Sequence, residues 1–310
     1  MLSICIYSFY EDLFLLKCLN SINDSSFQDY IIDLYIYSKH DVSNIIELNQ
    51  FSQIEISILN KRKSYAEICN ISIEKAKNRN CDYFLLLNSD TILKNNTLLV
   101  LLNAISQKNN LGVVGAFQTE YNGEWNEPNY WTKEILKTTY STERIKINDQ
   151  ELTFHKCEYV QGACMLIKLE IINIVGFFDV RFKLFYEETE FCRRVRNNFL
   201  DVVILEEAKI KHFSGGTWKR NILLRYRRDI LYLTNQLIYE STNKSTTYIR
   251  LFSEILLISK KQIFNLLKKK DNHKLPIALY FLIILSLICK VSFLLSLFKK
   301  QSVYNSQHND

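Results

Sequence analysis

Short apolar runs alternate with amphipathic stretches through the first half of the chain, and this alternation constrains the fold more than any other feature. It predicts strands at residues 2–7, 31–37, 54–59 and 83–87, and helices at residues 11–22, 41–50, 64–79 and 95–107. Strands that alternate with helices of about 10–15 residues are typical of βαβ units and a parallel sheet. Ligands of such sheets bind beyond the carboxyl ends of the strands, so functional residues are expected there.

The second half of the chain is less regular. We predict strands at residues 112–117 and 159–167, a helix at 187–198, and helical structure beyond residue 217. Seven Gly and two Pro among 310 residues argue against a turn-rich all-β protein and against long flexible linkers. The chain is therefore expected to form an α/β domain with a helical extension.

The eight cysteines contain no CxxC pair and no cysteine–histidine spacing of a metal site. Several lie in apolar runs, where cysteine behaves as a small hydrophobic residue. This pattern favours a reducing compartment over a disulfide framework. Because the first residues lack the basic region and cleavage site of a signal peptide, we expect a cytoplasmic protein.

Charge is distributed unevenly along the chain. Residues 1–208 carry 21 Lys and Arg against 28 Asp and Glu, whereas residues 209–300 carry 18 against 4. A basic segment of this kind suits nucleic acid, an anionic bilayer or diphosphate groups, or is simply a solvated surface. No nucleic-acid motif accompanies the charge, so we predict no nucleic-acid partner.

An almost wholly apolar run at residues 275–298 follows the basic region. Its uninterrupted part, residues 277–289, has 13 residues, fewer than the roughly 20 that span a bilayer. Lysines flank the run at 268–270 and 299–300, as in an interfacial anchor. We predict contact with an anionic membrane surface, while a true span and a buried hairpin stay open as alternatives.

The clearest local signal for chemistry is the apolar strand that ends in Asn88-Ser89-Asp90. This places the Asp90 carboxylate at the carboxyl edge of the predicted sheet. Hard cations such as Mg²⁺ prefer oxygen ligands and bridge protein carboxylates to substrate phosphates. A carboxylate after a strand also often starts a turn or caps a helix, and that alternative remains open.

A second signal is the acidic trio Glu187, Glu188 and Glu190, which follows an aromatic run. Mutual repulsion and partial burial raise the pKa of a carboxyl group, which suits a general base that takes a proton from a sugar hydroxyl. The alternative is an acidic first helical turn stabilised by the helix dipole, with Arg194 paired to Glu190 at i,i+4. Both interpretations can hold at once, each for different glutamates of the trio.

Together these segments resemble bacterial family 2 glycosyltransferases with a GT-A fold, particularly the rhamnosyltransferase-like branch. That branch reads lNPDt, then GgFDErFFlYyEDvDlclRlr, then a His before GGS. Here residues 88–91 read NSDT, 176–190 read GFFDVRFKLFYEETE, and 212–217 read HFSGGT. Residues 64–70, SYAEICN, resemble the family's GfagarN, and residues 226–229, YRRD, resemble its yRN. The five pieces occur in order and cover about residues 2–230.

The resemblance implies a GT-A-type mixed, mainly parallel sheet flanked by helices in residues 1–230. It leaves residues 231–310 as a helical, basic and apolar extension. It assigns a metal, Mg²⁺ or Mn²⁺, to Asp90 and His212, and the role of catalytic base to Glu188. Support around the acceptor pocket is expected from Glu187, Glu190, Asp179, Gly162 and Ala163. Donor contacts are expected from Phe9, Tyr10, Tyr37, Asn70, Asn88 and Asp90.

Two departures from the family pattern affect these expectations. The family's DNgS after the second strand, whose Asp reads the nucleobase, corresponds here to residues 37–41, YSKHD, and its TYN corresponds to Ser8-Phe9-Tyr10. Tyr10 or Tyr37 can stack on a base, but the identity of the base stays open. Glu188 replaces an Asp and is longer by one methylene, which matters because catalysis is sensitive to ångström displacements.

The predicted function is inverting, metal-dependent sugar transfer from dTDP-rhamnose or a UDP-sugar to a glycan or lipid-linked glycan. The resemblance implies a role in bacterial surface polysaccharide synthesis, such as lipopolysaccharide or capsule, at the inner face of the cell membrane. One alternative is a non-catalytic homologue that binds a nucleotide-sugar. Another is a sugar nucleotidyltransferase, which needs a Gly-rich phosphate loop near the N-terminus; residues 4–15 contain no Gly.

Overall fold

The computed structural model describes residues 1–9, 14–37, 48, 51–213, 231, 232, 235, 236, 238 and 239. The chain divides into two compact units, Met1–Asn221 and Ile222–Asp310, and the first contains every element discussed below. The expected boundary after residue 230 stays a prediction. The apolar run at 275–298, most of the predicted helix at 41–50 and the yRN-like residues 226–229 lie outside the described residues. Among the residues described, no helix is long and apolar enough to cross a membrane.

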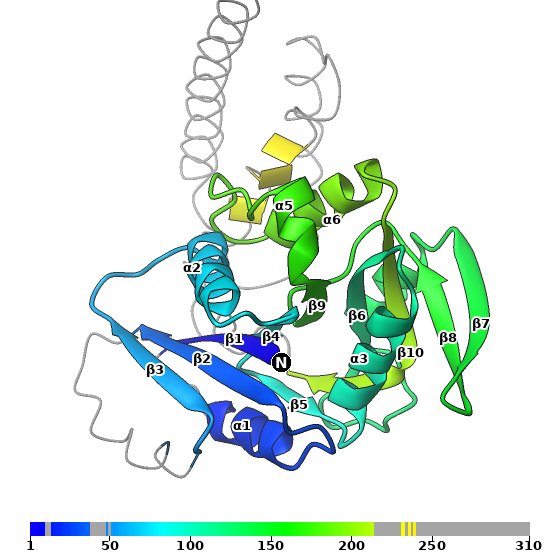
Figure 1. Cartoon of the computed structure of the whole chain (residues 1–310), viewed down its shortest axis with the longest axis horizontal. Helices are drawn as coiled ribbons and strands as arrows, with labels where there is room; N and C mark the ends of the chain where they lie inside the picture. Colours follow the sequence, from blue (N-terminus) through cyan, green and yellow to red (C-terminus); the bar gives the residue numbers. More distant parts are fainter. Residues whose placement is uncertain are drawn as a thin grey trace, which may run out of the picture. The chain divides into compact units, whose positions relative to one another are not determined.

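One mixed sheet with helices on both faces forms the centre of the first unit (Figure 1). Its strands are β1 (Leu2–Phe9), β2 (Tyr30–Tyr37), β3 (Ile54–Leu59), β4 (Tyr83–Asn88), β5 (Thr91–Leu93), β6 (Leu111–Glu120), β7 (Ser141–Ile147), β8 (Gln150–Lys156), β9 (Cys164–Lys168) and β10 (Asp201–His212). Its α-helices are α1 (Leu15–Asn23), α2 (Tyr65–Asn78), α3 (Thr97–Gln107), α4 (Tyr130–Leu136), α5 (Ile172–Val175) and α6 (Glu187–Asn197). The predicted class, an α/β fold with a mixed sheet, is confirmed.

The strand order is β3-β2-β1-β4-β9-β6-β10-β8-β7, with β5 paired to β10. Strands β1 to β4 are mutually parallel, and β10 is parallel to β6. The remaining pairings, all involving β5, β7, β8 or β9, are antiparallel. The carboxyl ends of β1, β2, β4, β6 and β10 therefore meet at one edge of the sheet.

Strand alternation distributes apolar side chains to both faces of this sheet. In β1, Ile4 and Ile6 pack with residues of α1 and α3, whereas Cys5 and Tyr7 pack with residues of α2 and α6. Because successive strand residues point to opposite faces, a run that is buried throughout must be covered on both sides. Figure 1 shows this arrangement, with α1 and α3 on one side and α2, α5 and α6 on the other.

Helix α2 illustrates how closely local sequence determines an element. Ser64 accepts a hydrogen bond from the Glu67 amide while the Glu67 carboxylate accepts from the Ser64 amide, which forms a capping box. The buried face of α2 recurs at helical spacing and consists of Ala66, Ile68, Cys69, Ser72, Ile73 and Ala76. The helix predicted at 64–79 is therefore confirmed to within one residue at each end.

Several elements differ from the sequence-based expectation, and β5, α4 and α5 were not predicted. The strand predicted at 159–167 begins only at Cys164, because residues 159–163 form a connecting loop. The β7–β8 hairpin was not predicted, because its outer strand alternates charged and polar residues with few apolar ones. Strand β10 was also missed, since Glu206 and Glu207 interrupt its apolar pattern where the register with β6 shifts. The seven described cysteines are buried, as expected of small apolar side chains.

Candidate functional site

The carboxyl edge of the sheet brings together residues that are far apart in the sequence. In the ladder, Tyr7 of β1 lies opposite Asn88 of β4, and Phe9 lies opposite Tyr37 of β2. These strand ends therefore form a continuous platform, as predicted for the ligand-binding edge of a parallel sheet. Tyr10 and the residues after Tyr37 lie outside the described part of the chain, so their expected donor contacts stay predictions.

Asp90 and His212 form a close pair at this edge. Strand β5 runs antiparallel to β10 with Thr91 opposite His212, and the amide of Phe213 donates to the Asp90 carbonyl at 3.1 Å. The pairing sets the His212 imidazole against the Asp90 carboxylate, with 3.2 Å between Nε2 and Oδ1. His212 is only 8% exposed. The structure thus brings together the two residues predicted to hold the metal.

The opposite side of the His212 ring contacts Gln118, which the sequence did not single out. His212 Nδ1 lies 2.8 Å from Gln118 Oε1, and Gln118 is 2% exposed on β6. The Asn88 amide nitrogen lies 3.4 Å from His212 Nε2, while Asn88 Oδ1 accepts from the Tyr65 hydroxyl at 2.5 Å. Gln118 lies near His212 because β6 pairs with β10 in parallel. No local sequence motif predicts this pairing, so the sequence did not indicate the contact.

The donor set of this pair fits a hard divalent cation. A carboxylate oxygen and an imidazole nitrogen are both accepted ligands of Mn²⁺, and Mg²⁺ accepts the oxygen readily. Among the described residues, no group of three or more His, Cys, Asp and Glu side chains is placed to hold a metal ion. A cation bound by Asp90 and His212 would leave coordination positions for phosphate oxygens and water.

Two strained residues position the start of α6. Phe185 and Tyr186 have φ values of +70° and +69°, which non-glycine residues rarely adopt. Such strain persists only where the surrounding structure enforces it, and it is concentrated at functional sites. The turn that contains them places Glu187 and Glu188 at the first positions of the helix, with Glu187 only 4% exposed.

Burial dominates the chemistry of Glu187 and Glu188. Desolvation raises the pKa of Glu188 to about 7, although a backbone hydrogen bond from Gly162 acts in the opposite direction. Desolvation and the neighbouring Glu188 charge raise the pKa of Glu187 well above its usual range. The Oε2 atom of each has no hydrogen-bond partner among the described residues. A carboxyl group of this kind can take up a proton near neutral pH.

The loop that contains Gly162 and Ala163 connects the two halves of the site. The backbone of Gly162 hydrogen-bonds to Glu188, and the Ala163 carbonyl accepts from the Asn88 amide at 3.1 Å. A Cβ atom at position 162 would lie 3.3 Å from Leu86 Cδ2 and 3.5 Å from Tyr65 Cε1, so the close fit favours glycine. The predicted acceptor-side loop therefore reaches both the Glu188 carboxylate and the end of β4.

Glu190 and Asp179 are engaged in ion pairs instead of facing open space. Arg194 binds Glu190 with Nε–Oε1 and Nη2–Oε2 distances of 2.8 Å, and it also donates to the Val175 and Phe177 carbonyls. The i,i+4 pair expected as the alternative interpretation of Glu190 is thus present. Partial burial alone would raise the pKa of Asp179, but hydrogen bonds from Arg181 outweigh it and lower that pKa.

Asn70 holds the loop that precedes α6. Its side-chain nitrogen donates to the Phe178 carbonyl at 2.9 Å, and its Oδ1 accepts from the Phe178 amide at 2.9 Å. These two bonds occupy the amide group in a backbone contact, and the expected contact of Asn70 with the donor stays a prediction.

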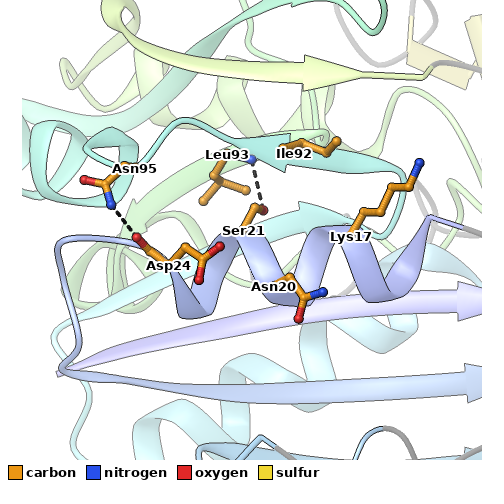
Figure 2. Close-up of a pocket in the computed structure, with 7 residues that line it drawn as sticks. All are labelled: Lys17, Asn20, Ser21, Asp24, Ile92, Leu93 and Asn95. Atoms are coloured by element: carbon orange, nitrogen blue, oxygen red, sulfur yellow. Dashed lines mark hydrogen bonds between the residues drawn. The ribbon is translucent and has the colours of Figure 1, made fainter.

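A separate cavity of about 400 Å³ lies between α1 and β5 (Figure 2). None of the predicted site residues lines this cavity.

Comparison with solved structures identifies the fold. The mannosyltransferase PcManGT from Pyrobaculum calidifontis in complex with GDP-Man and Mn²⁺ matches with a TM-score of 0.57 and 11% identity, over 98% of this chain and 83% of that one. GalNAc-T7 with UDP, GalNAc and Mn²⁺ matches with a TM-score of 0.56 and 14% identity, over 71% and 44%. S. aureus TarS matches with a TM-score of 0.53 and 12% identity, over 81% and 41%. The chain thus spans less than half the length of GalNAc-T7 and of TarS.

At these identities the likeness shows the GT-A-like fold alone. No match was found among curated protein sequences. Neither the structures nor the family model distinguishes a rhamnosyltransferase branch or a bacterial source. The model of glycosyl transferase family group 2 matches residues 83–298, which is more than half of the chain. The chain therefore belongs to glycosyl transferase family group 2.

Proposed function

We propose that the chain transfers a hexosyl group from a nucleotide-sugar to an acceptor hydroxyl with inversion at the anomeric carbon. One observation carries the proposal: the Asp90–His212 pair and the Glu188 carboxylate are joined through one short stretch of backbone. Asn88 at the metal-side strand end bonds to Ala163, and the adjacent Gly162 bonds to Glu188. A donor held at the first group and an acceptor held at the second would then meet at this edge.

Asp90 and His212 would hold a divalent cation together with the donor diphosphate. Such a cation neutralises the charge that develops on the leaving diphosphate. The Mn²⁺ and nucleotides in the PcManGT and GalNAc-T7 structures support this assignment by analogy of fold. In the chain itself, the pairing of β5 with β10 brings the backbone of Asp90 beside that of His212 and Phe213, which supports this assignment.

Glu188 would act as the general base. Its partly desolvated carboxylate takes the proton of the acceptor hydroxyl as that oxygen bonds to the anomeric carbon and the bond to the diphosphate breaks. One direct displacement inverts the configuration and needs no covalent sugar–enzyme intermediate. Glu187 is more deeply buried than Glu188, so we assign it to support instead of proton transfer.

The donor is proposed to be dTDP-rhamnose or a UDP-sugar, as the resemblance of residues 88–91 and 176–190 implies. Tyr37, which ends β2 on the platform, is the described aromatic best situated to stack on the nucleobase. A panel of nucleotide-sugars with Mn²⁺, followed first by thermal shift and then by release of nucleoside diphosphate, tests this choice. Binding of a nucleotide-sugar by the wild type without release of nucleoside diphosphate would instead support a non-catalytic binding protein.

The acceptor is proposed to be a glycan or lipid-linked glycan of bacterial surface polysaccharide synthesis, met at the inner face of the membrane. The support is the sequence: residues 209–300 carry 18 basic against 4 acidic side chains and include the apolar run at 275–298. Each basic residue near an anionic leaflet contributes about 1 kcal/mol to binding. The full chain should bind anionic vesicles, high salt should release it only partly, and truncation before Leu275 should release most of it. Unfolding of the truncated chain would contradict the anchor.

A further inference from the structure

His212 carries a constraint that the pair with Asp90 does not explain by itself. A metal-binding imidazole must offer a lone pair from one ring nitrogen, and the hydrogen bond made by the other nitrogen determines which one. Here Nε2 faces Asp90 Oδ1 at 3.2 Å and Nδ1 faces Gln118 Oε1 at 2.8 Å. The partner of Nδ1 therefore decides whether Nε2 can bind a cation.

Gln118 makes that choice by the orientation of its amide. A carbonyl oxygen can only accept a hydrogen bond, so Nδ1 must carry the proton when Oε1 faces it. Gln161 fixes the orientation of the Gln118 amide, because Gln118 Nε2 donates to Gln161 Oε1 at 3.0 Å. The contact with Asn88 on the other side of the ring is consistent with this tautomer. The Asn88 amide nitrogen lies 3.4 Å from His212 Nε2 and can only donate.

The backbone of Gln118 is held as firmly as its side chain. The Thr132 hydroxyl lies 2.9 Å from both the amide nitrogen and the carbonyl oxygen of Gln118. Thr132 is in turn fixed by Asn129, whose Oδ1 accepts from the Thr132 amide at 2.9 Å. The backbone of Gln118 therefore cannot shift away from His212 without disturbing the start of α4.

In the Nδ1–H tautomer, the lone pair of His212 Nε2 faces Asp90 Oδ1. Adjacent ligands around a cation with bonds of about 2.1 Å are separated by about 3 Å, close to the 3.2 Å between these atoms. We propose that Gln118, supported by Gln161, is a positioning residue that fixes the Nδ1–H tautomer of His212 and so prepares Nε2 to bind the divalent cation. The proposal rests on the proposed metal-dependent function.

The test measures Mn²⁺ binding by electron paramagnetic resonance, alone and with UDP or GDP, together with the ¹⁴N coupling of a directly bound imidazole. Gln118→Leu removes the acceptor and should weaken Mn²⁺ binding about 10–100-fold, the usual effect of losing such a partner. It should also reduce the imidazole coupling. Gln118→Glu keeps an acceptor for Nδ1–H and should bind Mn²⁺ within a few-fold of wild type. Gln161→Leu should lie between the two.

A merely structural role for Gln118 gives a different pattern. Both Gln118→Leu and Gln118→Glu lose the bond to Gln161, so equal loss of Mn²⁺ binding in both would overturn the proposal. Wild-type affinity and coupling in a folded Gln118→Leu, with folding checked by thermal denaturation, would overturn it as well. If wild type itself shows no imidazole coupling, the metal assignment to His212 fails and this inference fails with it.

Discussion

The two ends of the candidate site treat their carboxylates in opposite ways. Asp90 lies against the imidazole of His212, whereas Glu188 is surrounded by desolvating groups and a second carboxyl group, Glu187. At the first end, two potential ligands converge on one point. At the second end, the Oε2 atom of each glutamate has no hydrogen-bond partner among the described residues. This difference in surroundings matches the two roles that we propose, cation binding for Asp90 and proton transfer for Glu188.

Local backbone structure produces this difference. Asp90 directly precedes β5, and β5 pairs with β10 so that Thr91 lies opposite His212. The sheet pairing therefore places the His212 imidazole next to Asp90. Glu188 instead follows two residues in the left-handed region, which turn the chain so that α6 begins within the protein. The pairing of β5 with β10 thus places the His212 imidazole beside Asp90, whereas Glu188 Oε2, after the strained turn, has no hydrogen-bond partner among the described residues. Each prediction below changes one end of the site and leaves the other intact.

Asp90→Asn is expected to have the largest effect. The amide keeps the shape of the side chain but removes the negative charge that would hold the cation, so turnover should be abolished and Mn²⁺-dependent binding of nucleoside diphosphate weakened. The fold should persist, because Asp90 lies at the surface edge of the sheet. Steady-state release of nucleoside diphosphate and calorimetric titration with UDP or GDP measure both effects. Ser89→Ala is the matched control, and near-normal activity of Asp90→Asn with Mn²⁺ present would refute the metal assignment.

Glu188→Gln should reduce transfer by roughly 10²–10⁴-fold, the usual contribution of a positioned general base. Donor affinity should barely change, since the carboxylate is assigned to the acceptor. Single-turnover rates with a radiolabelled donor separate the chemical step from binding. If Glu187→Gln is the inactive variant and Glu188→Gln keeps its activity, the roles of the two carboxyl groups must be exchanged.

The pKa of Glu188, about 7, predicts a smaller effect of pH on the wild type. A base must be deprotonated, so kcat/KM should fall roughly tenfold per pH unit below pH 7 and level off above it. The raised pKa also affects stability: the contribution is present below the ordinary value of 4.5 and is lost as pH rises through about 7. Glu188→Gln should therefore have a higher Tm than wild type at pH 8, with the difference vanishing near pH 4. An unchanged difference across this range would contradict the burial of an ionisable group at 188.

The sequence predicted the parallel half of the fold well because each element there is specified locally. Strand β4 is a continuous apolar run, and α2 has its own capping box and a buried face at helical spacing. Asp90, Glu188 and His212 could be named because the motifs that contain them are contiguous. Gln118 could not, because its importance comes only from the pairing of β6 with β10. The β7–β8 hairpin was missed for a different reason, because an exposed hairpin needs few apolar residues.

Glu190 gives the smallest predicted effect on chemistry and separates the acidic trio into two roles. Its carboxylate is neutralised by Arg194, which also donates to the carbonyls on either side of Gly176, a residue with φ of +77°. Glu190→Gln should therefore lower the free energy of unfolding by about 2 kcal/mol, the typical value of a charged hydrogen bond, while activity changes less than tenfold. Urea denaturation and nucleoside diphosphate release report the two quantities. Glu74→Gln, an exposed glutamate within α2, is the control and should change neither. Should Glu190→Gln instead match the activity loss of Glu188→Gln at unchanged stability, the ion pair is not its main role, and the division of the trio between support and catalysis must be redrawn.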